Sequence, residues 1–71
     1  MIDLINCNMK IQIDELNRIL GEFDGSQDIE VLVSSSVVGS NALSQAASKG
    51  IKCRVEPFEA GAWKVVLISN L

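Results

Sequence analysis

The hydrophobic and polar positions in the first third of the chain predict a short strand followed by an amphipathic helix. Residues 1–5 are mostly apolar, which is typical of an opening strand. Over residues 12–23, apolar side chains recur three and four positions apart, and charged side chains occupy the other side. We expect Asp14 and Glu15 in the first turn of this helix, where carboxylates stabilise the positive end of the helix dipole.

The middle of the chain predicts a second strand and a second helix. Residues 28–34 alternate between apolar and polar positions, as in a strand with one buried face. The serines at residues 34–36 can cap a helix that begins at Val37 or, with a later cap, at Asn41, and Gly50 is suited to end it. The side chains expected on the buried stripe of this helix are Ala42, Leu43, Ala46 and Ala47.

The last third predicts two strands joined by a short glycine turn. Residues 51–56 alternate, and the following Pro57 lacks a backbone donor, which favours a strand at the sheet edge. Residues 63–68 are apolar on both faces apart from Lys64, which favours the sheet interior. The predicted fold class is therefore an α/β two-layer sandwich with the order β-α-β-α-β-β. We expect a four-stranded mixed sheet with two helices on one face, in a single domain of residues 1–71.

The sheet face away from the helices is expected to carry an apolar patch. If Val65 and Leu67 point towards the helices, Val66 and Ile68 point away, beside Leu32 of the second strand. Exposed apolar groups on a small protein often mark a contact surface. Leu32, Val66 and Ile68 are thus the predicted surface for a protein partner or for a homodimer.

Composition narrows the function classes. Nine acidic and six basic residues give a net charge of −3, which argues against nucleic-acid binding. No apolar run approaches the roughly 20 residues of a membrane span, and there is no secretory signal, so we expect a cytoplasmic protein that does not bind membranes. Cys7 and Cys53 are too few for a disulfide framework, and without any histidine no metal site or other cofactor is expected.

Two weaker candidates have simple structural interpretations. Residues 36–40 follow a strand and open a helix, so their N–H groups could hold an anion, but helix capping explains them as well. The basic cluster of Lys49, Lys52 and Arg54 is most simply a solvated edge, with contact to an acidic partner as the alternative.

Four features occur together in this chain: the element order, the length of 71 residues, Asp3 in the first strand and Gly50 before Ile51. In this combination the chain resembles the TusA/SirA family of small sulfur carriers. The resemblance extends over almost the whole chain. It implies that the fourth strand lies between the second and the third. It also implies a protein partner such as a cysteine desulfurase or another component of a sulfur relay.

Members of this family usually place a Cys-Pro-x-Pro motif just before the first helix, six residues after an aspartate like Asp3. Counting from Asp3 puts Met9 at the cysteine, Lys10 at the first proline and Gln12 at the second. The family chemistry needs a thiolate that accepts sulfur as a persulfide, and methionine has no ionisable S–H group. Met9 therefore cannot accept sulfur in this way.

Cys7 lies two residues before the position of the family cysteine. A shifted loop could present Cys7 at the start of the first helix, where thiols become more reactive. Alternatively, it is a small, partly buried thiol that closes the first strand. Cys53 alternates with Ile51 and Val55 on the inner face of its strand and is expected in the core.

Three functions follow from these observations. The leading hypothesis is a non-catalytic binding or accessory module that has kept the fold and lost the sulfur-accepting motif. The first alternative is an active sulfur carrier, and so a sulfurtransferase, that uses Cys7. The second is a docking subunit of a larger complex that binds through the open sheet face.

Overall fold

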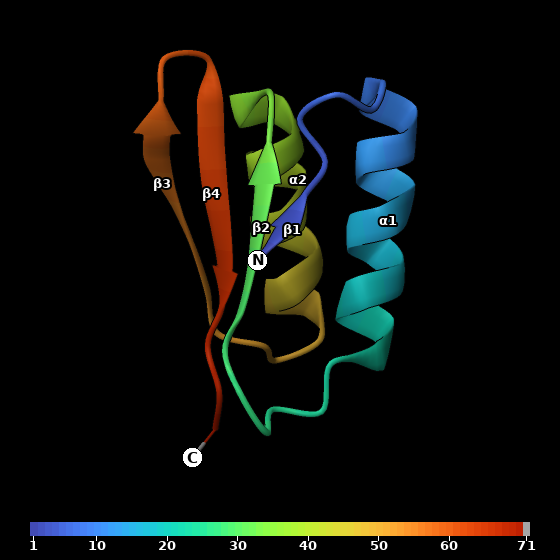
Figure 1. Cartoon of the computed structure of the whole chain (residues 1–71). Helices are drawn as coiled ribbons and strands as arrows, with labels where there is room; N and C mark the ends of the chain where they lie inside the picture. The colour runs from blue at the N-terminus through green and yellow to red at the C-terminus, as the bar shows by residue number, and fades with distance from the viewer. Residues whose placement is uncertain (71) are drawn as a thin grey trace.

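The computed structural model describes residues 1–70, and Leu71, the last residue of the expected domain, lies outside them. Its elements are β1 (Ile2–Asp3), α1 (Met9–Glu22), β2 (Ile29–Val33), α2 (Ser36–Ser48), β3 (Cys53–Glu59) and β4 (Ala62–Leu67). The sheet has the order β1-β2-β4-β3, with β1 parallel to β2 and the other neighbours antiparallel. Both helices lie on the same side of this sheet (Figure 1). The predicted fold class and strand order are thus confirmed.

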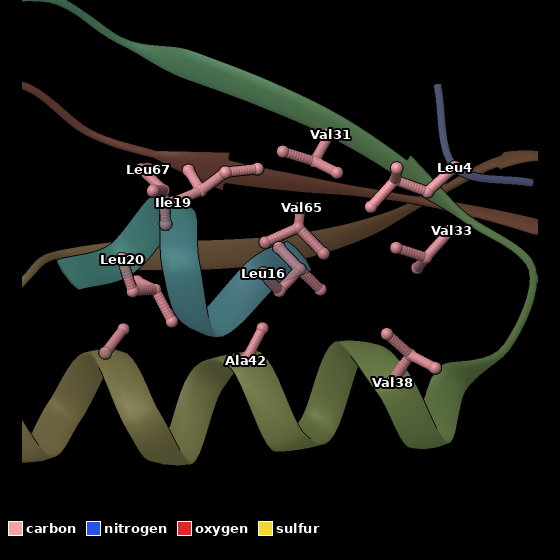
Figure 2. Packing of buried hydrophobic residues seen from close by; sticks show 11 residues of the cluster. Leu4, Leu16, Ile19, Leu20, Val31, Val33, Val38, Ala42, Val65 and Leu67 are labelled. Carbon is pink, nitrogen blue, oxygen red and sulfur yellow. The ribbon is translucent and has the colours of Figure 1, made fainter. Parts of the chain in front are cut away.

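The hydrophobic core fills the space between the sheet and the two helices (Figure 2). Alternate positions of β2 and β4 point towards the helices, and three- and four-residue spacing places the apolar stripes of α1 and α2 opposite them. The buried side chains of this core cluster are Leu4, Leu16, Ile19, Leu20, Val31, Val33, Val38, Ala42, Ala46, Val65 and Leu67. The expected inward orientation of Val65 and Leu67 is therefore confirmed.

Helix α1 begins at Met9, three residues earlier than the sequence pattern predicts. The cause is Asn8, whose side-chain Oδ1 accepts a hydrogen bond from the N–H of Ile11 at 2.9 Å and caps the helix. Asp14 and Glu15 consequently lie in the second turn, so the prediction that they occupy the first turn is wrong.

Helix α2 begins at Ser36 and is capped by Ser35, whose Oγ accepts from the N–H of Val37 at 3.1 Å. The alternative start at Asn41 is therefore wrong. Two of the four side chains expected on the buried stripe, Leu43 and Ala47, are exposed. Their place against the sheet is taken by the buried residues Val38 and Gly39.

Gly39 allows α2 to pack unusually close to β3. A Cβ atom at this position would lie only 2.8 Å from Cγ1 of Val55, which is closer than two carbon atoms can approach without movement. The absence of a side chain thus permits the close approach of α2 to β3 at this position.

Strand β3 runs from Cys53 to Glu59 rather than over residues 51–56, and it continues through Pro57, which pairs with Trp63 of β4. Proline is tolerated because β3 is an edge strand, as predicted, while β4 is interior, also as predicted. Strand β1 is shorter than the predicted residues 1–5 because Asp3 accepts a hydrogen bond from the N–H of Ile5 and turns the chain away.

Truncation of Leu67 to alanine should lower the free energy of unfolding by about 2–5 kcal/mol, because this side chain is fully buried between the sheet and the helices. Urea titration followed by circular dichroism measures the loss. Leu43→Ala is the matched control: its side chain is 40% exposed, so the cost should stay below about 1 kcal/mol. Equal losses in the two variants would contradict the assigned packing.

Candidate functional site

The loop that joins β1 to α1 is the candidate functional site, because it carries Cys7 and leads directly into Met9. It lies at the end of the sheet where the carboxyl ends of β1 and β2 meet the start of both helices (Figure 1). In α/β sheets this end is where ligands and reacting groups are commonly bound. The candidate site therefore lies at the end of the sheet where ligand-binding and reacting groups are expected.

Met9 and Lys10 are the first two residues of α1, and both are exposed. Met9 is 48% exposed, so the position of the family cysteine is accessible but holds a thioether. The ammonium group of Lys10 lies 2.8 Å from Oδ2 of Asp14, one turn further along the helix. This carboxylate raises the pKa of Lys10 above its ordinary value, chiefly through the hydrogen bond between them. Lys10 thus remains a solvated cation on the surface.

Gln12 is fully buried, and its side chain makes three hydrogen bonds. Its Nε2 donates to the carbonyl oxygen of Cys7 at 2.7 Å and to Oγ of Ser34 at 2.9 Å. Its Oε1 accepts from the backbone N–H of Ser34 at 3.1 Å. One side chain therefore joins the first turn of α1, the loop before it and the end of β2.

Cys7 is held in place by its backbone on both sides. Its N–H donates to the carbonyl oxygen of Leu4 at 3.0 Å, and its own carbonyl accepts from Gln12. The side chain is half-buried and packs against the core cluster. Of the two interpretations of Cys7, this arrangement matches the partly buried thiol that follows the first strand.

Cys53 is the first residue of β3 and lies far from Cys7. It pairs across the sheet with Leu67, which in turn pairs with Ile29, the first residue of β2, whereas Cys7 lies beyond the other end of β1. The side chain is half-buried against the core cluster, and this burial raises the pKa of the Cys53 thiol. The expected inward orientation of Cys53 is confirmed, and the two thiols do not form one site.

The start of α2 is accounted for by capping. Ser35 caps the N–H of Val37, its carbonyl accepts from the N–H of Gly39 at 3.2 Å, and the hydroxyl of Ser34 is bound to Gln12. Residues 36–40 have no other feature that indicates a bound anion, so helix capping is the better supported interpretation of this segment.

The open sheet face differs from the apolar patch that the sequence predicts. Leu32 and Val66 point away from the helices as expected, but they are only 6% and 1% exposed, so the prediction that they are accessible is wrong. The cross-strand neighbours of Val66 are Glu30 and Arg54, whose long side chains flank it. Ile68 is half-exposed.

Charged side chains form a network over this face. Nζ of Lys64 lies 3.6 Å from Oε2 of Glu30 and 3.5 Å from Oε1 of Glu56, and Nε of Arg54 lies 3.2 Å from Oε2 of Glu56. The hydrogen bond from Arg54 is the main reason why the pKa of Glu56 is lowered, with Lys64 contributing. Arg54 therefore belongs to this ion-pair network rather than to a basic cluster with Lys49 and Lys52.

A cavity of about 330 Å³ lies at the opposite end of the molecule, where both helices end. It is lined by Leu20, Gly21, Phe23, Asp24, Gly25, Lys49, Gly50, Ile51 and Asn70. None of these residues belongs to the β1–α1 loop, so the cavity is separate from the candidate site. No pattern in the sequence predicts this cavity, because it arises from the meeting of two helix ends that are far apart in the chain.

Residues 1–70 lack both a metal-binding cluster and a membrane-spanning helix. They contain no group of three or more histidine, cysteine, aspartate or glutamate side chains that could hold a metal ion. No helix within the same range is both long and apolar enough to cross a membrane.

Replacement of Gln12 by leucine should lower the free energy of unfolding by roughly 1–3 kcal/mol, because the part-buried carbonyl of Cys7 and N–H of Ser34 then lack their partner. Gln27→Leu, at an exposed loop position, is the matched control and should change stability by less than about 0.5 kcal/mol. Urea titration measures both. A loss of under 1 kcal/mol for Gln12→Leu would contradict the role assigned to this side chain.

Replacement of Gln12 by glutamate should make stability depend on pH. A carboxylate cannot donate to the Cys7 carbonyl, whereas the protonated carboxyl can, so folding raises the pKa of the new group above about 4.3. The stability deficit relative to the wild type should therefore grow as pH rises from about 4 to neutrality. Urea titrations at pH 4 and pH 7 test this sign, and a deficit that is larger at pH 4 would contradict it.

Alkylation should modify Cys53 more slowly than Cys7 in the native protein, because burial raises the pKa of Cys53 and leaves less of the reactive thiolate. The rates are measured at pH 8 with iodoacetamide and mass spectrometry in Cys7→Ser and Cys53→Ser variants. In urea the two rates should converge, and a native rate for Cys53 that equals its rate in urea would contradict the assigned burial.

No protein-family model matches this chain, and a search of curated proteins finds no match. Among solved structures, a SirA-like protein from Desulfitobacterium hafniense superposes with a TM-score of 0.80 and 18% sequence identity. The superposition covers 99% of this chain and 96% of that chain. At this level of identity the likeness is one of fold. The chain thus shares the two-layer α/β fold of that SirA-like protein over almost its whole length.

Proposed function

We propose that this chain is a non-catalytic binding or accessory protein built on a SirA-like fold. The observation that carries the proposal is the side chain at Met9. The position where the resemblance places the sulfur-accepting cysteine is accessible, at 48% exposure, but holds a thioether that cannot ionise. The fold is therefore present without, at this position, the nucleophile that persulfide formation requires.

The buried amide of Gln12 supports the same proposal. It occupies the position of the second proline of the family motif and holds the loop by three hydrogen bonds to Cys7 and Ser34. A loop that is held by side-chain bonds to β2 keeps its shape without the prolines. This arrangement is suited to presenting a surface rather than to moving a reactive thiol towards a partner.

The binding end would be the start of the two helices. Met9, Ile11 and Val37 are large apolar side chains there, with exposures of 48%, 45% and 60%. They lie on the first turns of α1 and α2, which begin at the same end of the molecule (Figure 1). An apolar surface of this kind is typical of a contact with another protein, such as a component of a sulfur relay.

The alternative is an active sulfur carrier that uses Cys7, loaded by a cysteine desulfurase. It is favoured by the position of Cys7, a free thiol immediately before the capping residue Asn8 at the start of α1. Against it stands the packing of the Cys7 side chain on the core cluster. Docking through Leu32, Val66 and Ile68 is less well supported, because the first two side chains are almost fully buried.

Incubation with a cysteine desulfurase and cysteine separates these proposals. We expect mass spectrometry to detect no stable persulfide on the wild-type protein, because Met9 cannot accept sulfur and Cys7 faces the core. Met9→Cys is the matched positive control, since it places a thiol at the exposed first residue of α1. It should gain one sulfur atom if the desulfurase can reach this end of the protein.

A persulfide on Cys7 of the wild type would overturn the accessory role and establish the sulfur carrier. The assignment requires that Cys7→Ser abolishes the added sulfur and that Cys53→Ser, which removes the thiol at the other end of the sheet, leaves it unchanged.

A further inference from the structure

The free edge of β3 presents unpaired backbone groups in a regular row. Lys52 pairs with Ile68, because the N–H of Ile68 donates to the carbonyl of Lys52 at 2.9 Å, and the same antiparallel register continues with Arg54 opposite Val66. Hydrogen-bonded and outward-facing positions alternate along such a strand. The N–H and C=O groups of Cys53 and Val55, and the C=O group of Pro57, therefore point away from β4. Within residues 1–70, no helix or strand lies beyond this edge (Figure 1).

We propose that this edge pairs with β3 of a second copy of the chain, in an antiparallel dimer whose two-fold axis passes through Val55. In this register the two Val55 residues exchange both of their backbone hydrogen bonds. The N–H of each Cys53 donates to the carbonyl of Pro57 in the other copy. Pro57 does not block the pairing, because only its carbonyl is needed, and the irregularity in β3 begins after it, between Pro57 and Glu59.

The charges on β3 are complementary in this register, and they favour it over the neighbouring register. Pairing centred on Val55 places Arg54 of each copy directly opposite Glu56 of the other, on the open sheet face where both side chains are solvent-accessible. Opposite charges at facing positions stabilise a strand pair, and like charges destabilise it. The neighbouring register, centred on Cys53, would instead place Arg54 opposite Lys52. A second copy of the same strand thus fits the edge by both hydrogen bonding and charge.

Charge reversal tests the proposal without depending on any ligand. The wild type should show a concentration-dependent monomer–dimer equilibrium in analytical ultracentrifugation. Arg54→Glu and Glu56→Arg each place like charges opposite one another twice, so each variant should dimerise about tenfold or more weakly. An equimolar mixture of the two variants restores opposite charges in the mixed dimer and should associate about as strongly as the wild type.

Arg18→Glu is the matched control, because it changes the charge by the same amount on the exposed surface of α1 and should leave association unchanged. Circular dichroism confirms that each variant is folded. As an independent readout, hydrogen exchange at the Val55 amide should slow as the protein concentration rises. A wild type that stays monomeric at millimolar concentration overturns the proposal, as does a dimer that the single reversals leave intact or that their mixture fails to restore.

Discussion

The buried amide of Gln12 is the interaction on which the start of this fold depends. Its three hydrogen bonds connect the loop at Cys7, the first turn of α1 and the end of β2 at Ser34. A buried amide without hydrogen-bond partners would lower the stability of the protein by several kcal/mol. The three hydrogen bonds therefore favour one relative position of these three segments. This loop follows the two-residue strand β1, which pairs in parallel with β2.

The chain shares its fold with a SirA-like protein. The loop before α1 contains no proline and is anchored by the side chain of Gln12. The exposed start of α1 then carries Met9, while the nearby thiol of Cys7 packs against the core. The sheet and the helices position this surface, and its function depends on the residues that it carries.

Pro57, which has no backbone donor, indicated the edge position of β3. The periodicity of the sequence was sufficient to predict the element order, the two-layer architecture and the interior position of β4. These features follow from which side chains must avoid water, which is a property of each segment by itself. Asn8 was also visible in the sequence as a capping residue, and recognising it would have placed the start of α1 correctly.

Only the tertiary structure decided which of these side chains are buried and what they bind. The missing side chain of Gly39 allows α2 to lie against Val55, a contact that no pattern within the helix predicts. Val66 is buried on a face that has no second layer, because charged neighbours on two other strands lie beside it. From the sequence alone, Gln12 resembles a polar surface residue, because its partner Ser34 is 22 positions away in the chain. Local periodicity indicates which side of a helix or strand points towards the core, but contacts between distant segments depend on how those segments pack.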